Sequence, residues 1–270
     1  MNRYKSLTAM VVMGAALAAC TTAPSGRQQL LMLSDSELSQ LGAQSFEQLK
    51  AEQTLSNNAA HRRYVGCVVN ALVAELPQEW RSQSWEVQVF ADEAPNAFAL
   101  PGGKVGVNTG MLDLAQNQDQ LAAVIGHEIG HVVFRHANER MSRSTLVGAG
   151  VQAGGALVGT RTTPETARTV AGLLGAGAQL GVMLPFSREQ EREVDVYGQD
   201  LMAKAGFDPA EASRLWQNMI AASGRSAGTL QALSTHPDPQ ARASALQRRA
   251  PDLQATYQDA RSQGKRPACR

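Results

Sequence analysis

The hydrophobic and polar positions of this 270-residue chain first recur at helical spacing. Apolar side chains line one face of two stretches, 34–49 and 60–76, as expected for amphipathic helices. The first stretch opens with Ser34-x-x-Glu37, a capping box, and Pro77 follows the second and cannot continue a helix. The pattern therefore predicts two helices at the start of the folded region.

The period then changes to two, which is typical of strands half buried in a sheet. Residues 85–90 alternate between apolar and polar, and a Pro-Gly-Gly turn separates 96–100 from 104–108. We expect these three stretches to form a small antiparallel sheet, with 110–115 as a short connecting helix. Residues 96–100 form either an edge strand, along which an extended substrate could pair, or an interior strand.

The next apolar run, 124–134, is hydrophobic nearly all round, so the helix that it forms should be central and buried. Asp119 is placed to cap this helix. Gly126 and Gly130 lie one turn apart, and each lowers the intrinsic stability of the helix by about 1 kcal/mol relative to Ala. We therefore expect this face to pack closely against another element.

Residues 147–184 are rich in glycine and alanine and carry few charges. Because each apolar run in this stretch is short for a membrane span, we expect two small-residue helices on the domain or near a membrane surface. Three further helices are predicted by their end signals. The signals are Ser187 with Gln190 and a closing Gly206, then Asp208-Pro209, then Asp238-Pro239. The predicted fold class is thus α+β, mainly α with a small antiparallel sheet.

The N-terminus carries signals of export. Arg3 and Lys5 precede a short apolar segment, 9–19, that is typical of a signal peptide rather than a membrane span. The residues Leu-Ala-Ala-Cys at 17–20 resemble the lipobox of bacterial lipoproteins, in which the cysteine becomes the lipidated N-terminus. In the alternative, an ordinary signal is cleaved and Cys20 is incidental.

The export signals and the net charge restrict where the protein is located and what it can bind. Thr21 after the cysteine, where Asp would favour retention, predicts lipid anchoring at the periplasmic face of the outer membrane. In that oxidising compartment Cys67 and Cys269 could pair, which the sequence leaves open. A net charge of +1 gives no electrostatic case for a nucleic-acid partner. The predicted organisation is a signal peptide at 1–19, a lipidated tether at 20–33 and one folded domain at 34–270.

The buried run contains His127, Glu128 and His131 in an H-E-x-x-H sequence. On a helix the two histidines sit one turn apart on the same face, so both imidazoles can reach one metal ion while Glu128 stands beside it. The alternative is a pair of histidines in a helix core. The spacing is that of a zinc hydrolase, and such a site needs a third protein ligand.

The stretch 187–195 offers three glutamates as the third ligand. Glu191 is favoured, because Asp195 lies four residues later on the same helix face and can accept the free ring N–H of a ligand histidine. Glu189 is a rival without such an acidic partner. Glu193 then points elsewhere and is either solvated or paired with an arginine.

Two histidines and one carboxylate suit zinc, which lowers the pKa of a bound water to about 7. Glu128 would act as the general base: it takes the proton of the attacking water and returns it to the leaving amine. Non-haem iron can use the same ligands, but this does not explain a glutamate directly after the first histidine.

Two histidines lie outside the motif. His136 is nine residues from His127, which on a continuous helix places it on the opposite side, so we expect a structural role. His236 precedes Pro237, and the residues alone leave a turn histidine and a functional histidine equally open.

Four motifs, in this order along the chain, indicate a resemblance to a known protein family. They are residues 96–103, 127–131, 184–195 and 234–237. Together they resemble the membrane-associated gluzincin metallopeptidases of the CaaX prenyl endopeptidase, HtpX, BepA and LoiP type, over about residues 34–249. Small lipoprotein peptidases of the LoiP kind are the nearest match, because the chain lacks evident transmembrane helices and a tetratricopeptide repeat domain.

The resemblance implies a gluzincin-type, mainly helical domain with zinc held by His127, His131 and Glu191. It also implies that His236 lies near the metal, where it could stabilise an oxyanion or occupy the open position. The implied function is a lipid-anchored zinc endopeptidase that cleaves misfolded or misassembled envelope proteins. The alternative is an assembly factor that holds unfolded outer-membrane proteins, with little or latent proteolysis.

Overall fold

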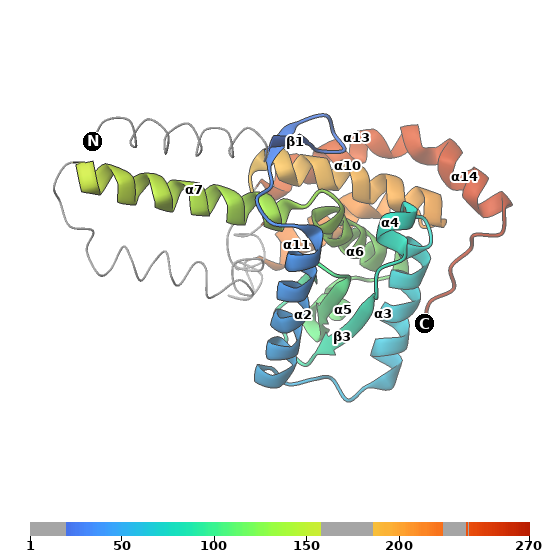
Figure 1. Ribbon diagram of the computed structural model, residues 1–270. Helices are drawn as coiled ribbons and strands as arrows, with labels where there is room; N and C mark the ends of the chain where they lie inside the picture. The colour runs from blue at the N-terminus through green and yellow to red at the C-terminus, as the bar shows by residue number, and fades with distance from the viewer. Residues whose placement is uncertain (1–19, 158–185, 224–235, 237) are drawn as a thin grey trace.

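The computed structural model describes residues 20–157, 186–223, 236 and 238–270, and of residues 147–157 only the backbone. The predicted signal peptide and most of the glycine- and alanine-rich stretch lie outside the described residues. Within them, helices pack around a three-stranded sheet, and a two-stranded sheet lies at the edge of the body (Figure 1). The predicted α+β class is confirmed.

The elements follow one another along the chain as the end signals suggest. In order they are β1 (Cys20–Thr22), β2 (Gln28–Leu30), α2 (Asp35–Glu52), α3 (Ala59–Val73), α4 (Gln78–Arg81), β3 (Glu86–Phe90), β4 (Ala97–Leu100), β5 (Lys104–Asn108), α5 (Thr109–Leu114), α6 (Gln118–Val133), α7 (His136–Leu157), α10 (Arg188–Ala205), α11 (Glu211–Ala222), α13 (Pro239–Arg249), the 3₁₀ helix η1 (Ala250–Leu253) and α14 (Gln254–Ser262). The site described below uses α6, α7, α10 and α13.

The two early helices form where the pattern predicts them. Ser34 and Glu37 make the predicted capping box of α2, each side chain bonding the backbone N–H of the other. The second helix, α3, ends at Val73, and the chain turns through Leu76 before Pro77. Helix α3 is therefore shorter than predicted at its C-terminal end.

The three-stranded sheet has the order β3-β5-β4. Strands β4 and β5 pair antiparallel across their tight turn, but β3 runs parallel to β5. The prediction of a purely antiparallel sheet is therefore wrong, because alternation of side chains fixes which face a strand buries and not its direction. Strand β4 lies at an edge of this sheet, which is one of the two positions that the sequence left open.

Helix α6 is the centre of the molecule. All of its residues from Gln120 to Val133 are buried, which confirms the prediction of a central helix. Its cap is Asn117, whose side chain accepts from the Gln120 backbone N–H. The prediction that Asp119 caps the helix is wrong, because Asp119 lies in the first turn and accepts instead from the backbone N–H of Asp208.

Glycines bring α6 and α10 unusually close. A Cβ on Gly126 would lie 3.2 Å from the carbonyl oxygen of Gly198, and one on Gly198 would lie 2.8 Å from the backbone nitrogen of His127. A Cβ on Gly130 would lie 2.9 Å from Cβ of Val194. The predicted close packing is confirmed, and it sets the distance between the residues that α6 and α10 carry.

Helix α7 starts after a sharp change of direction. Arg135 has φ 55°, in the left-handed region that a non-glycine residue seldom occupies, and α7 begins at the next residue, His136. The helix then extends away from the body of the molecule, through residues that include the start of the glycine- and alanine-rich stretch (Figure 1). Among the described helices, none is both long and apolar enough to cross a membrane.

The end signals of α10 are all confirmed. Ser187 and Gln190 make the predicted capping box, and Gly206 ends the helix with φ 83°. The signals of the next two helices fit less well. Asp208 bonds the Ala210 backbone N–H in a turn, so that α11 begins only at Glu211.

The last predicted cap is also corrected. Pro239 occupies the first turn of α13 as expected, but the side chain of Asp238 makes no capping bond. Asp238 has φ 61° and instead forms an ion pair with Arg188 of α10, with 2.7 Å between Oδ2 and Nε. The left-handed backbone at Asp238 thus directs its carboxylate to a neighbouring helix.

Both ends of the described chain are tied to the body. A disulfide joins Cys67 in α3 to Cys269, a pairing that the sequence left open. At the other end, Cys20 to Thr22 pairs antiparallel with Gln28 to Leu30, and Ala23 between them is buried in the main core. The stretch that we predicted as a tether therefore contains regular, packed structure.

Candidate metal centre

The two histidines of α6 present the same ring nitrogen to one point. Nε2 of His127 and Nε2 of His131 lie 3.2 Å apart. Glu191 of α10 faces them, with Oε2 3.5 Å from Nε2 of His127 and Oε1 3.7 Å from Nε2 of His131. With His236, these residues offer four ligand atoms that all lie within 4.8 Å of one another.

This donor set fits a zinc ion. Two imidazole nitrogens and a carboxylate oxygen converge at a buried point, which is the ligand type and number of a catalytic zinc site. Burial holds the pKa of the His131 imidazole well below its usual range, so the ring is neutral and can offer a lone pair. The structure thus brings together His127, His131 and Glu191, and their roles as ligands remain a prediction.

Glu128 also lies beside the cluster, although as the residue next to His127 it projects from α6 at a different angle. Its side chain is buried, and burial raises the pKa of the carboxyl group. Oε1 lies 3.7 Å from Nε2 of His236. A raised pKa brings the carboxyl closer to neutrality, which suits a group that must both accept and return a proton.

His236 lies inside the cluster, although the sequence alone left its role open. Its Nδ1 is 3.0 Å from Oε1 of Glu191 and 3.3 Å from Nε2 of His127. The side chain is largely buried. The position permits His236 to be either a fourth ligand or a group that faces the reacting carbonyl.

The outward nitrogen of His127 is held by a carboxylate and an arginine. Nδ1 lies 3.0 Å from Oδ1 of Asp195, as predicted from the four-residue spacing to Glu191. Arg242 of α13 donates from Nη2 and Nε to the two Asp195 oxygens, at 2.6 and 2.7 Å. Its Nη1 lies 2.5 Å from Oε2 of Glu191, so one guanidinium holds both acidic residues.

The outward nitrogen of His131 is held by a second histidine. Nδ1 of His136 lies 2.9 Å from Nδ1 of His131. The prediction that His136 sits on the far side of the helix is wrong, because it assumed a continuous helix, whereas the backbone reverses at Arg135. His136 therefore lies against His131.

Glu193 and Glu189 behave differently from Glu191. Glu189 is exposed, which removes it as the rival third ligand. Glu193 is buried and faces away from the cluster, with Oε2 3.0 Å from Nε2 of His136 and Oε1 2.9 Å from Nε of Arg27. The arginine pairing predicted for Glu193 is confirmed, and the solvated alternative is wrong.

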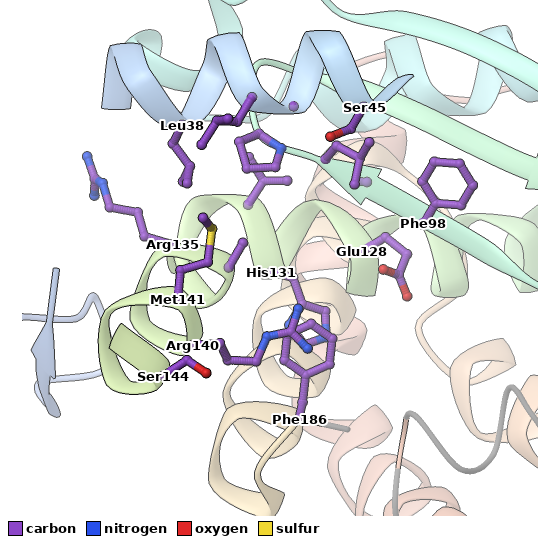
Figure 2. Close-up of a pocket in the computed structure, with 17 residues that line it drawn as sticks. Leu38, Ser45, Phe98, Glu128, His131, Arg135, Arg140, Met141, Ser144 and Phe186 are labelled. Atoms are coloured by element: carbon purple, nitrogen blue, oxygen red, sulfur yellow. The ribbon is translucent and has the colours of Figure 1, made fainter. Parts of the chain in front are cut away.

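A cavity of about 840 Å³, its open mouth included, adjoins the cluster. Figure 2 shows Leu38 and Ser45 of α2, Phe98 of β4 and Met141 of α7 around it, with Glu128 and His131 on one side. The ring of Phe186 stacks on His131, with 3.6 Å between ring centroids. Its lining offers a mainly apolar surface next to Glu128.

A second cavity, of about 500 Å³ with its open mouth included, also has Glu128 in its lining. It is lined further by Asn96 and Ala97 at the start of β4, by Trp216 of α11 and by His236. Strand β4 thus passes Glu128 with one cavity near each of its ends. An extended chain along this edge would reach both cavities.

Three residues of the site were missed by sequence reasoning. They are Arg27, His136 and Arg242. The two arginines act across the fold and share no spacing with the motifs. His136 had a signal, its closeness to His131 in sequence, but its position depends on a backbone reversal at an arginine, which is not a usual turn residue.

Comparison with known proteins agrees with this geometry. The model of peptidase family M48 matches residues 59–250. The mitochondrial metalloendopeptidase OMA1 of Schizosaccharomyces pombe is 38% identical over 191 residues, which cover 71% of this chain and 53% of that protein. In OMA1 of Arabidopsis thaliana the match is 36% over 163 residues, or 60% of this chain and 31% of that protein.

Bacterial proteins also match. The beta-barrel assembly-enhancing protease of Escherichia coli K12 is 29% identical over 218 residues, covering 78% of this chain and 43% of that protein. Metalloprotease LoiP of the same organism is 28% identical over 191 residues, covering 67% of this chain and 69% of LoiP. The chain spans about half the length, or less, of most of these relatives. Because the family model covers most of the chain and its metal-site motifs, the chain belongs to peptidase family M48, a family of zinc metallopeptidases.

Proposed function

We propose that the protein is a zinc-dependent endopeptidase, anchored by lipid at Cys20 to the periplasmic face of the outer membrane, that cleaves misfolded or misassembled envelope proteins. The observation that carries the proposal is the convergence of His127, His131 and Glu191 beside the buried carboxyl of Glu128. The anchor rests on the lipobox-like residues that end at Cys20. Two bacterial relatives, named as a beta-barrel assembly-enhancing protease and a metalloprotease, support the class of activity.

In this mechanism His127, His131 and Glu191 hold the zinc ion. When bound, zinc supplies Lewis-acid chemistry, which polarises a carbonyl group and lowers the pKa of a water molecule. Glu128 accepts the proton of that water and delivers it to the leaving amine. The buried setting, which raises the pKa of Glu128, keeps the carboxyl ready for both steps. Nε2 of His236 faces Glu128 and is placed to donate to the oxyanion.

We infer that the substrate is an extended, unfolded segment that pairs with β4. In the part of the chain that the structure describes, β5 pairs with one side of β4 and no strand pairs with the other. Backbone pairing selects for extended chain rather than for particular side chains. The mainly apolar cavity lined by Leu38, Phe98 and Met141 favours a large apolar residue beside the scissile bond. Such residues are buried in folded proteins and exposed in misfolded ones.

The test replaces the proton carrier and keeps the metal. Glu128→Gln should retain stoichiometric zinc and lose casein hydrolysis by a factor of at least about 10². Glu189→Gln, an exposed neighbour of the same motif region, is the matched control and should stay active. Hydrolysis by zinc-loaded Glu128→Gln at the parental rate, or absence of zinc from the parent, would overturn the proposal.

A second candidate is an assembly factor that holds unfolded outer-membrane proteins and cleaves them rarely. One observation favours it: His236 lies within hydrogen-bonding distance of Glu191, where it can close the open metal position. Under this candidate, cells that carry Glu128→Gln have a wild-type envelope. Under the endopeptidase proposal these cells resemble the deletion strain, so envelope permeability to a large antibiotic separates the two.

A further inference from the structure

The chain just after Cys20 is tightly packed. Residues 20–30 form the β1-β2 hairpin, in which the Ala23 backbone N–H donates to the Arg27 carbonyl at 2.8 Å. The next residues are bonded to the first turns of α7: the backbone N–H of Met32 donates to Oγ of Ser142 at 2.8 Å. Figure 1 shows the hairpin beside α10 and the start of α7. The hairpin is therefore fixed relative to both helices.

Arg27 projects from this hairpin onto two buried carboxylates. Nη1 and Nη2 donate to the two oxygens of Glu139 at 2.7 and 2.8 Å. Nε and Nη2 donate to the two oxygens of Glu193 at 2.9 and 3.0 Å. The hydroxyl of Ser25 also donates to Glu193. Such paired contacts fix the plane and position of a carboxylate, and a single point charge does not.

From Glu193 the contacts continue to a predicted metal ligand. Nε2 of His136 lies 3.0 Å from Oε2 of Glu193, and Nδ1 of His136 lies 2.9 Å from Nδ1 of His131. If Nε2 of His131 offers its lone pair to a metal, Nδ1 must carry the hydrogen. His131 then donates to His136, and His136 donates from Nε2 to Glu193. Each link has one donor and one acceptor, so the arrangement admits a single tautomer at both rings.

We propose that Arg27 is a positioning residue of the metal centre, which through Glu193 and His136 fixes the ring and the tautomer of His131. The N-terminal hairpin thereby contributes, through Arg27, to the positioning of His131. The inference rests on the proposed function only in that His131 binds the metal. Partners of this kind outside the ligands typically change metal affinity by about 10- to 100-fold when removed.

The alternative is a purely structural role, in which Arg27 only holds the hairpin onto the domain. Both roles predict some loss of stability, but only positioning predicts a change at the metal. The matched control is Lys265→Met, which removes the 2.8 Å ion pair with Glu75 that ties the other end of the chain to the body. Among the described residues, the Lys265–Glu75 pair is not part of the cluster of candidate ligands.

The experiment compares the full chain with Arg27→Met, Arg27→Lys and Lys265→Met. The readouts are the zinc dissociation constant against a chromophoric chelator, and the visible spectrum of the cobalt-substituted protein, which reports ligand geometry. Arg27→Met should raise the dissociation constant several-fold, to at most about 10-fold, and alter the cobalt spectrum. Arg27→Lys should be intermediate, and Lys265→Met should match the parent in both.

The other outcomes distinguish a failure of this inference from a failure of the proposed function. A folded Arg27→Met with the parental dissociation constant and spectrum overturns the inference and leaves the proposed function intact. A parent that binds no zinc overturns both. If Arg27→Met does not fold, the cycle of Arg27→Lys, Glu193→Gln and the double variant decides: zinc affinities that are not additive support the relay, and additive ones overturn it.

Discussion

His127 and His131 of α6, whose ring nitrogens converge, are supported from opposite ends of the chain. His127 is held by Asp195, which Arg242 of the C-terminal region clamps. His131 is held by His136, then Glu193, then Arg27 of the N-terminal hairpin. Both supports end in an arginine that grips a buried carboxylate, but only the second contains an additional imidazole.

The difference concerns charge and distance. An anionic acceptor directly on the ring of His127 raises the basicity of that imidazole more than a neutral imidazole can on His131. The support of His127 also lies deeper: the side chain of Arg242 is 7% exposed and that of Arg27 is 14% exposed. His127 is therefore fixed mainly by electrostatic contacts inside the helical body. His131 is fixed by a longer series of contacts that ends in the N-terminal hairpin.

The largest effect is expected where the deeper arginine is removed. Arg242→Met leaves Asp195 and Glu191 buried without their cation, which should lower the free energy of unfolding by about 3–5 kcal/mol. Urea denaturation of the chelator-treated protein measures it. Arg249→Met, which breaks the more exposed pair with Asp200, is the control and should cost less than about 1 kcal/mol. Equal losses in the two variants would contradict the asymmetry.

A smaller loss of stability is expected when the contact between α6 and α10, which carry residues of both supports, is disturbed. Gly198→Ala places a Cβ 2.8 Å from the His127 backbone nitrogen and 2.9 Å from the Gly126 carbonyl carbon, so α6 and α10 must separate. Overpacking of this kind costs about 1–3 kcal/mol in unfolding free energy. Gly66→Ala, where the added Cβ meets nothing within 4 Å, is the control. A Gly198→Ala protein of parental stability would show that the close approach is not required.

These contacts separate what the sequence can predict from what it cannot. The two capping boxes, at Ser34 and Ser187, were predicted correctly, because each depends on residues three positions apart. The same holds for the convergence of His127 and His131, which one helical turn imposes. Each of these features is local, so the pattern of side chains contains it. The single-residue caps predicted at Asp119 and Asp238 were wrong, because contacts with distant segments hold those side chains instead.

The remainder depends on contacts between distant segments. The Arg27–Glu193 pair joins residues 166 apart in sequence, and no periodicity marks it. The parallel pairing of β3 with β5 and the left-handed backbone at Arg135 are likewise decided by packing, since neither strand alternation nor an arginine indicates them. His136 was misplaced for this reason, and the support of His131 could not be predicted.

The unequal strength of the two acceptors should appear in zinc affinity. Asp195→Asn removes the anionic acceptor of His127 and should raise the zinc dissociation constant about 10- to 100-fold. His136→Gln replaces a neutral acceptor by another and should raise it by about 10-fold or less. Competition with a chromophoric chelator measures both. The reverse order would mean that the longer relay, and not the direct carboxylate, dominates the affinity.

The smallest effect concerns acid stability on the His131 side. Burial would raise the pKa of the Glu139 carboxyl, but hydrogen bonds from Arg27 and Gln190 outweigh it and hold that pKa below its ordinary value of 4.5. The stabilising contribution of the ionised group is therefore complete above about pH 4.5 and is lost as the pH falls through the lowered value. Glu139→Gln should cost about 1 kcal/mol in unfolding free energy at pH 7.

The same variant should also lose less stability than the parent between pH 5 and pH 3, by urea denaturation of the zinc-free protein. Zinc-free protein is necessary, because acid also releases a metal from its ligands. Glu86→Gln, which removes a partly exposed carboxylate from its lysine partners, should change this slope less, since solvent screens the pair. A Glu139→Gln protein with the parental dependence on pH would show that the Arg27–Glu139 ion pair contributes nothing to acid stability.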